Sequence, residues 1–407
     1  MLRFTTAGES HGAALVSILE GMPAGVPLLV EDVDAQLARR QAGYGRGRRM
    51  QIETDRAELL SGVRAGETLG SPIAMLIRNH DWRNWQEIMN PAPLPDETDA
   101  PAARKRAVTR PRPGHADLAG MLKYGRTDAR DILERASARE TTARVAAGAV
   151  CRALLARLEV SIGSHLVELG SVAARIPEAL PPDLNAAADR SPLRTLDSEA
   201  EARMIELIDE AKRSGDTLGG ICEVVVTGLP VGLGSHVSWD RKLDGRLAAA
   251  LMSIPAVKGV EIGMGFQAAR LHGSRVHDEI DPAEAAVTRG RMSRRSNNAG
   301  GLEGGMTTGE PLVIRVAMKP ISTLMRPLAS VEMTTRESAA STVERSDVTA
   351  VPAMGVIAEA MAAFVLADAA LEKFGGDSLS EVRRNREGYL RYLAERDGGH
   401  LDGRDAG

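Results

Sequence analysis

A short pattern that occurs three times places the strongest constraint on how this chain can fold. The pattern is G-x-T-x-G followed by an apolar run, and its copies start at Gly66, Gly215 and Gly305. Glycines at fixed positions indicate a tight turn, and the apolar run indicates a buried strand. Repetition of one turn-and-strand unit is typical of an internally repeated architecture rather than of unrelated domains. The first two copies are most simply interpreted as structural turns.

Hydrophobic periodicity predicts further elements around these units. Apolar residues at helical spacing, with acidic residues at the start or glycine at the end, indicate helices at residues 32–40, 131–158, 198–214, 240–254 and 351–374. Apolar runs indicate strands at residues 15–19 and 257–263, whereas residues 171–199 have the composition of a loop.

Composition restricts the class of protein. The chain has 407 residues, of which 43% are apolar and 3% are aromatic, so it can form one large domain or two around an aliphatic core. Scarce aromatic residues argue against stacking on nucleic-acid bases, and the net charge of −4 argues against a general nucleic-acid binder. Arginine makes up 44 of the 51 basic residues. Either a GC-rich genome or recognition of carboxylates and phosphates explains this bias.

The two cysteines, Cys151 and Cys222, lie far apart without metal-binding spacing. We therefore predict buried thiols in a reducing compartment and no metal site. The start of the sequence has no apolar targeting segment. The apolar run at residues 351–371 contains Glu359 and Asp368, which argues against a membrane span. These features predict a cytoplasmic protein.

The stretch GESHG at residues 8–12 places an acid, a hydroxyl and an imidazole between two glycines. Glycine allows close approach of the backbone to a ligand, and His11 can donate or accept a proton near neutral pH. The stretch is therefore a candidate catalytic loop. A turn with a solvated histidine is an equally good interpretation of these five residues alone.

Arginine and glycine also gather in several short segments. Residues 41–49 alternate the two, so that backbone N–H groups and guanidinium groups can face one anion. Residues 109–117 hold two arginines and a histidine, residues 297–305 are rich in glycine, and residues 319–323 add a lysine and two hydroxyls. Anion binding is one interpretation of these segments, and an RNA-binding arginine–glycine tract is another.

Taken together, these stretches resemble the chorismate synthase family from residue 1 to about residue 385. The segments that carry the resemblance are AGESHG at 7–12, GYGRG at 43–47, TRPRPGHAD at 109–117, ERASARET at 134–141, VKGVEIG at 257–263, AGGLEGG at 299–305, MKPIST at 318–323 and RSDV at 345–348. Each segment alone is a weak signal, but eight in one order are very specific.

The resemblance implies an α+β fold, an α/β sandwich with helices packed between antiparallel sheets, and a homotetramer. It implies a lyase that converts 5-enolpyruvylshikimate-3-phosphate to chorismate and phosphate by 1,4-anti elimination. This is the last common step of the shikimate pathway toward aromatic amino acids. Reduced FMN is the implied cofactor, with NADPH as an indirect reductant.

The resemblance also implies site residues. His11 helps to protonate the departing phosphate, His115 stabilises the anionic reduced flavin, Asp347 assists removal of the C6 proton, and Ser10 is a further catalytic candidate. The implied FMN contacts are Arg135, Ala136, Ser137, Pro255, Ala256, Gly304, Lys319, Pro320, Ile321, Ser322, Thr323 and Arg345. The implied contacts to substrate or NADPH are Arg40, Arg46, Arg48, Arg112 and Arg139. Pro255 departs from the family's usual Gln or Asn and lacks both a side-chain amide and a backbone donor.

We expect one catalytic domain over residues 1–385, with mobile loops at about residues 43–50, 90–114 and 281–297, and a polar, partly disordered tail at 386–407. Two other classes of function are weighed against this one. A phosphate transferase or kinase would use the glycine-rich loops for a nucleotide, but the sequence has no G-x-x-x-x-G-K-[ST] loop. An RNA-binding module would show affinity that falls steeply with salt.

Overall fold

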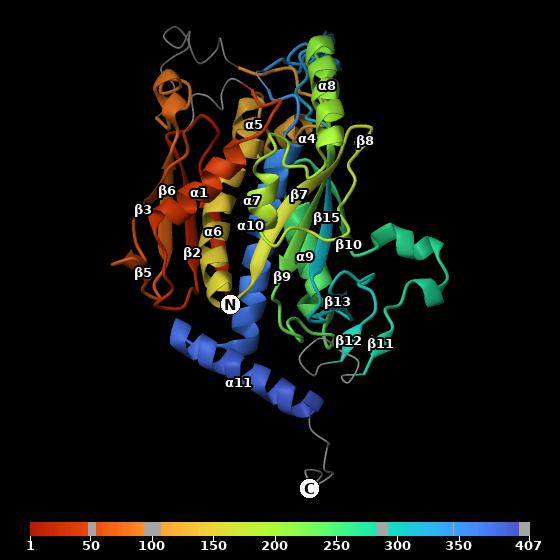
Figure 1. The fold of residues 1–407 in the computed structure, drawn as a ribbon. Coiled ribbons are helices and arrows are strands. Elements are labelled where there is room, and N and C mark those ends of the chain that lie inside the picture. The colour runs from red at the N-terminus through yellow and green to blue at the C-terminus, as the bar shows by residue number, and fades with distance from the viewer. Residues whose placement is uncertain (48–53, 93–106, 283–291, 345, 399–407) are drawn as a thin grey trace.

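The computed structural model describes residues 1–47, 54–92, 107–282, 292–344 and 346–398, with side chains to residue 395. Two antiparallel sheets enclose a layer of helices (Figure 1). The first sheet has the strand order β1 (Arg3–Ala7), β2 (Ala14–Glu20), β6 (Ile73–Arg78), β3 (Ala57–Leu59). The second has the order β10 (Val257–Ile262), β15 (Leu312–Met318), β9 (Gly220–Thr227), β7 (Ser161–Leu169), β8 (Val172–Ala173). This architecture confirms the expected α+β sandwich.

Strand register directs one face of each sheet toward the helices. In the first sheet, Leu15 of β2 lies opposite Ile77 of β6, and Leu19 lies opposite Ile73. All four side chains are fully buried. Because successive strand residues point to opposite faces, this register gathers the apolar side chains on the inner face.

Four helices form the layer between the sheets: α1 (Val30–Gln41), α6 (Thr141–Arg157), α9 (Leu243–Met252) and α10 (Val351–Phe374). Alanine and glycine allow α6 and α10 to approach closely. A Cβ added at Gly148 of α6 would lie 2.4 Å from the Cβ of Ala360 in α10, so no larger residue fits there without a shift. Among the described residues, α10 is the helix long and apolar enough to cross a membrane, and 89% of its most apolar window is buried inside the protein.

The other helices are α4 (Asp117–Tyr124), α5 (Arg130–Ala136), α7 (Leu184–Ala188), α8 (Ser198–Ser214) and α11 (Leu379–Gly398). Short 3-10 segments are η1 (His80–Asn84), η2 (Ala138–Glu140), η3 (Trp239–Arg241), η4 (Gly265–Arg270) and η5 (Gly273–Arg275). Two-stranded hairpins are β4 (Val63–Arg64) with β5 (Glu67–Thr68), β11 (Ile280–Asp281) with β12 (Ser293–Arg294), β13 (Leu302–Glu303) with β14 (Met306–Thr307), and β16 (Ala329–Val331) with β17 (Ser338–Ala340).

Two expectations about local structure need correction. The single helix expected at residues 131–158 is interrupted, because Ser137 is extended and its hydroxyl accepts the Arg139 N–H. The loop expected at 171–199 contains β8, α7 and the start of α8. Residues 386–398 of the expected tail belong to α11, and Tyr389 packs on the core. Residues 399–407 lie outside the described residues, as do parts of the three loops expected to be mobile.

The internal repetition is confirmed as a duplication of the two sheets. The strand order β1-β2-β6-β3 matches β7-β9-β15-β10, with α1 and α9 in equivalent places along the chain. One turn is repeated in detail. Thr68 donates to the Pro23 carbonyl at 2.6 Å and accepts the Val26 N–H at 2.9 Å. Thr307 likewise donates to the Pro230 carbonyl at 2.6 Å and accepts the Leu233 N–H at 2.8 Å.

The middle copy of the sequence pattern does not belong to this duplication. Thr217 donates instead to the carbonyl of Ile321, at 2.7 Å. The expectation of one unit used three times is therefore wrong for the copy at Gly215. The unit therefore occurs twice in the fold, at Gly66 and at Gly305. The middle copy of the sequence pattern connects α8 to β9.

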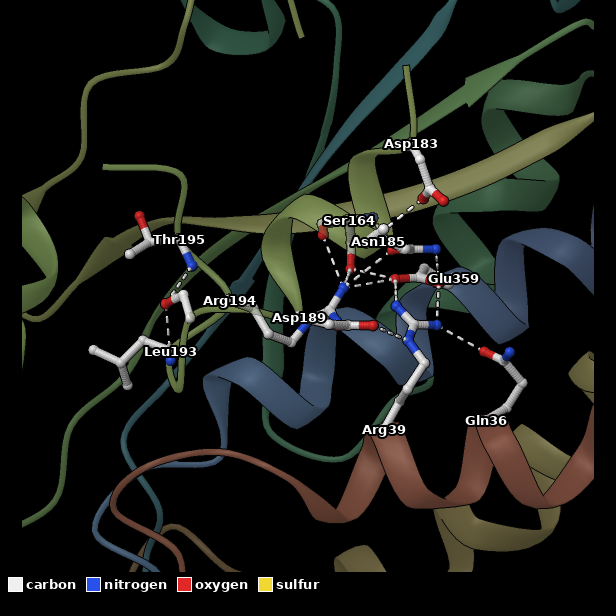
Figure 2. Close-up of polar contacts among 12 residues, drawn as sticks. Gln36, Arg39, Ser164, Asp183, Asn185, Asp189, Leu193, Arg194, Thr195 and Glu359 are labelled. Atoms are coloured by element: carbon white, nitrogen blue, oxygen red, sulfur yellow. Dashed lines mark hydrogen bonds and ion pairs between the residues drawn. The ribbon is translucent and has the colours of Figure 1, made fainter. Parts of the chain in front are cut away.

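A buried charge cluster ties the halves together at the centre of the helix layer (Figure 2). Glu359 of α10 is 1% exposed and accepts two hydrogen bonds from Arg39 of α1, at 2.9 and 3.0 Å. Arg152 of α6 donates at 2.8 Å, and Arg194 donates at 3.1 Å. The hydroxyl of Ser164, in β7, adds a contact at 2.6 Å.

Candidate active site

A cleft of about 980 Å³ opens where α6 and α10 both begin, near α4 and α5 in the upper part of Figure 1. Arg139, two residues before α6, and Ala350, the residue before α10, both line it. The N-terminal ends of two long helices carry partial positive charge, and this favours anions in the cleft.

His11 lies in the loop between β1 and β2, and it lines the cleft together with Ser10. Its ring Nδ1 is 2.9 Å from both carboxylate oxygens of Glu134, and its backbone N–H donates to Glu134 Oε2 at 2.8 Å. The ring stacks on Trp85 with centroids 3.8 Å apart and an angle of 24°. The imidazole is therefore fixed from its edge and from its face.

Glu134, at 2% exposure, forms an ion pair with Arg130 one turn earlier in α5, at 2.8 Å. Burial by itself would raise the pKa of Glu134. Hydrogen bonds and charge from His11, with the charge of Arg130, outweigh burial and hold the pKa below its ordinary value. The carboxylate is thus ionised at neutral pH.

His115 is held in a similar way by a second carboxylate. Its Nδ1 lies 2.5 Å from Oδ1 of Asp117, which is fully buried, and Arg112 donates to Asp117 Oδ2 at 2.8 Å. Burial would raise the pKa of Asp117, but His115 and Arg112 shift it well below its ordinary range. An ionised carboxylate can only accept, so the 2.5 Å contact with Asp117 favours a proton on Nδ1 of His115, and a nitrogen of the Arg112 guanidinium lies 3.1 Å from the same atom. Arg112 also donates to Thr323 at 2.8 Å.

Two buried arginines form the floor of the cleft and share one carboxylate. Arg139 donates to Asp55 at 2.5 Å, and the guanidinium of Arg40 lies 3.6 Å from the same carboxylate. Arg40 also donates to Thr141 at 3.0 Å and to the carbonyl of Ala138 at 2.8 Å. Burial lowers the pKa of Arg40 to about 9, against the opposing charge of Asp55. Two cations facing one buried anion leave an excess of positive charge.

Asp347 and two lysines complete the charged lining. Asp347 accepts the Gly47 N–H at 2.5 Å and pairs with Arg46 at 3.3 Å. Lys319 donates to the carbonyl of Gly114. Burial and the nearby charge of Lys258 lower the pKa of Lys319.

Comparison with known proteins decides the family. The sequence model of the family described as "Chorismate synthase" matches residues 2–371. The chorismate synthase of Symbiobacterium thermophilum is 59% identical over 396 residues, covering 97% of this chain and all of that protein. The chorismate synthase of Trichlorobacter lovleyi is 59% identical over 398 residues, with 97% and 100% covered. The chain belongs to the chorismate synthase family.

A crystal structure of a chorismate synthase agrees with the fold. It shares 43% identity, has a TM-score of 0.75 and covers 97% of this chain and 98% of its own. Enzymes of the chorismate synthase family are carbon–oxygen lyases that convert 5-enolpyruvylshikimate-3-phosphate to chorismate in the shikimate pathway. The kinase and RNA-binding alternatives are set aside on this ground.

Most residues implied by the resemblance to the chorismate synthase family line the one cleft. They are Ser10, His11, Arg40, Arg46, Arg112, His115, Ala136, Ser137, Arg139, Pro255, Ala256, Lys319, Ile321, Ser322, Thr323 and Asp347. Ser10 is 3% exposed, and the hydroxyl of Ser137 donates to it at 3.2 Å. Arg48 and Arg345 lie outside the described residues.

Three implied residues do not line this cleft. Arg135 is exposed and donates to the carbonyls of Gly8 and Thr6 at 3.1 and 3.0 Å, so it supports the loop from outside. Pro320 is exposed, and it does not line the cleft although its neighbours Lys319 and Ile321 do. Gly304 lies in the turn between β13 and β14.

Gly304 is far from the cleft within one chain. The next residue, Gly305, accepts a hydrogen bond from Leu243, the first residue of α9. Pro255 follows the other end of α9 and lines the cleft. A helix of this length spans about 15 Å. If Gly304 touches FMN, the contact must come from another copy of the chain.

Substitution of Gly304 by alanine is expected to cost at most about 1 kcal/mol of stability. Gly304 has φ +58°, and its equivalent in the first half, Ala65, adopts φ +53° with a methyl group. An added Cβ would lie 3.8 Å from the Cβ of His236, an ordinary contact. Urea unfolding measures the cost, and FMN titration of the same variant measures the cofactor affinity. A loss well above 1 kcal/mol would contradict the equivalence of the two turns.

Sequence reasoning missed several residues of the site. Asp117 stands two residues after His115, and a carboxylate this close to a candidate catalytic histidine was a signal that could have found it. Glu134 has no such signal, because it is 123 residues from His11 in the chain. Trp85 is one of three tryptophans in the chain. Asp55 and Arg130 carry no local signal, because only the fold brings Asp55 to Arg139. Among the described residues, no group of three or more His, Cys, Asp or Glu could hold a metal ion.

Proposed function

We propose that this cleft is the active site of the chain and that it binds 5-enolpyruvylshikimate-3-phosphate beside reduced FMN. The observation that carries the proposal is that two histidines, each held by a buried carboxylate, line the same cleft as a floor of buried arginines. The substrate has two carboxylates and a phosphate, and FMN adds a second phosphate. Guanidinium groups, which bind both kinds of anion with two parallel hydrogen bonds, suit this load.

The lining also fits the proposed cofactor. Cationic Lys258 and Lys319 suit the FMN phosphate, and apolar Leu133, Met318 and Val343 suit a flat ring. The FMN-holding residues would be Ala136, Ser137, Ala256, Lys319, Ile321, Ser322 and Thr323, with Pro255 contributing surface only. When bound, reduced FMN supplies an electron-rich ring that can lend charge to the substrate, which is useful because the C6 hydrogen has no adjacent carbonyl. NADPH is proposed only as an indirect source of electrons.

His11 is proposed to give its proton to the phosphate as the C3–O bond breaks. Its Nδ1 is committed to Glu134, so Nε2 is the ring atom for proton exchange. Ser10 lies next to it and bonds to Ser137, which suits a role in orienting the phosphate. His115, held by Asp117, is proposed to stabilise the negative charge of the reduced flavin.

Asp347 is proposed to receive the C6 proton. Among the described residues, one of its oxygens accepts the Gly47 N–H and the other pairs with Arg46. A carboxylate oxygen with one such contact keeps lone-pair capacity for a proton. The electrons of the C6–H bond shift through the ring into two new double-bond positions, and the C3–O pair leaves with the phosphate. The arginines Arg40, Arg112 and Arg139 are proposed to bind the anionic groups and hold them in place.

A homotetramer in the cytoplasm completes the proposal. Both features rest on membership of the family, and the substrate is a small molecule rather than a nucleic acid or a membrane.

The proposed reaction is redox-neutral overall, and this can be measured. With photoreduced FMN under anaerobic conditions, phosphate and chorismate should appear in equal amounts over many turnovers while the flavin absorbance returns to that of the reduced form. The matched control contains oxidised FMN, with which no product is expected. Consumption of one reduced flavin for each chorismate would contradict the proposal.

A further inference from the structure

We propose that Glu134 is a positioning residue, which holds His11 in the Nδ1–H tautomer and aims its Nε2 into the cleft. The inference rests on the proposed proton transfer by His11. It concerns a residue that is not among those lining the cleft, and it can be tested separately from the activity.

Glu134 anchors the loop before β2 at three points. Its backbone carbonyl accepts the Ser10 N–H at 2.9 Å, and its Oε2 accepts the His11 N–H at 2.8 Å. Its carboxylate also faces Nδ1 of the His11 ring at 2.9 Å. Because one residue holds both the backbone and the ring, the ring has little freedom to turn. Orientation of this kind is what a catalytic proton donor needs.

The chemistry of the contact decides which ring nitrogen carries the proton. Glu134 is buried and ionised, and an ionised carboxylate accepts hydrogen bonds but donates none. The nitrogen 2.9 Å away must therefore be the donor. The neutral ring then keeps its lone pair on Nε2, and the protonated ring presents its second proton there. A group that gives its proton to the departing phosphate must lose and regain that proton at one fixed atom, and Nε2 is that atom here.

Two further residues hold Glu134 and the ring in place. Arg130 donates to Glu134 at 2.8 Å and to Glu344 at 3.0 Å. The same guanidinium lies 5.0 Å from the ring of Trp85, on which His11 stacks. Loss of the Glu134 charge leaves Arg130 paired with Glu344. Glu134→Gln should therefore fold, and the amide can replace the carboxylate in shape but not in charge.

The other charged groups that line the cleft stay in place in this variant. They are Arg40, Arg46, Arg110, Arg112, His115, Arg130, Arg139, Lys258, Lys319, Glu344 and Asp347. A change in the pH dependence of Glu134→Gln therefore reports the loss of one negative charge beside His11.

Nitrogen NMR of histidine-labelled protein without ligand tests the tautomer directly. The His11 signal is assigned by its absence in His11→Ala. We expect the neutral ring to carry its proton on Nδ1 in the wild-type protein. A ring with its proton on Nε2 would overturn the proposal, whatever the activity. Near-normal turnover of His11→Ala together with an Nδ1 proton would remove the proposed proton transfer by His11 but keep the positioning by Glu134.

The pH profile of kcat/KM tests the effect of the Glu134 charge on His11. In Glu134→Gln, kcat/KM should fall about 10–100-fold, as is typical when the carboxylate behind a functional histidine is changed. The alkaline limb of its profile should move to lower pH, because the variant lacks the negative charge beside the ring. Glu134→Asp keeps the charge and should return the limb toward the wild-type position.

Glu344→Gln is the matched control, since Glu344 contacts the same arginine but not His11. The alkaline limb of its kcat/KM profile should lie at the same pH as in the wild-type protein. Thermal unfolding of each variant verifies that the fold is intact. Equal displacement of the limb in Glu134→Gln and Glu344→Gln would show a general effect of the Arg130 pair and would overturn the specific role of Glu134.

Discussion

Replacement of His11 or of His115 by alanine should lower turnover about 10²–10⁴-fold, the usual cost of a lost acid–base group. Both rings line the cleft, and each is held at Nδ1 by a buried carboxylate, so each has one nitrogen for exchange with a ligand. The substrate and cofactor bring several negative charges, which favour the imidazolium form. Binding to the wild-type protein should therefore take up protons near pH 7. Calorimetry in buffers of different ionisation enthalpy measures this uptake, and stopped-flow absorbance measures turnover.

His272→Ala is the control for these two variants, because His272 is exposed and does not line the cleft. It should retain full turnover and full proton uptake. If His11→Ala and His115→Ala both turn over at nearly the wild-type rate, and the wild-type protein takes up no protons, the two histidines have a structural role only.

The sequence predicted those helices whose ends are marked by local chemistry. Helix α8 begins and ends at the expected residues, because Asp197 caps its first turn and Gly215 takes the left-handed conformation after its last residue. Helix α10 also has the expected limits, with glycine after Phe374. In both cases the signal lies within a few residues of the boundary.

The break between α5 and α6 could not be predicted in the same way. No proline or glycine marks it, and the segment has the composition of one continuous helix. Ser137 leaves the helix because its hydroxyl bonds to the Arg139 N–H and to Ser10, a residue of a loop distant in sequence. This contact exists only after the first sheet has formed, so tertiary structure overrides helix propensity here.

The site shows the same division between local and distant signals. Glycine, proline and charge around His11 and His115 marked their segments as candidate sites in the sequence, and the structure brings both residues to one cleft. The sequence did not identify the carboxylates that set their chemistry. The partners of Arg139 and His11 are 84 and 123 residues away in the chain, and no local pattern reports such a pairing.

Substitution of Glu359 by glutamine should destabilise the protein by about 3–5 kcal/mol, the usual cost of removing one partner from a buried ion pair. Three arginines, Arg39, Arg152 and Arg194, would remain around a neutral amide in the helix layer. Figure 2 shows two of them, Arg39 and Arg194, beside Glu359. Glu372→Gln is the matched control. Glu372 lies on the same helix and pairs with two arginines, but it is 36% exposed. An exposed pair contributes about 0–1 kcal/mol, so this variant should unfold almost as the wild-type protein does.

The same cluster predicts how stability depends on acid. Burial would raise the pKa of Glu359, but Arg39, Arg152 and Arg194 lower it from 4.5 to about 2. A carboxylate with a depressed pKa in the folded state stabilises the fold above about pH 4.5, and this contribution is lost as the pH falls through about 2. A shift of this size corresponds to about 3 kcal/mol. Urea unfolding is measured at one protein concentration between pH 5 and pH 2. The wild-type protein and Glu372→Gln should lose this contribution to the free energy of unfolding as the pH falls, whereas Glu359→Gln should not. If the free energy of unfolding changes with pH in the same way for all three proteins, the acid sensitivity of the fold arises from groups other than Glu359.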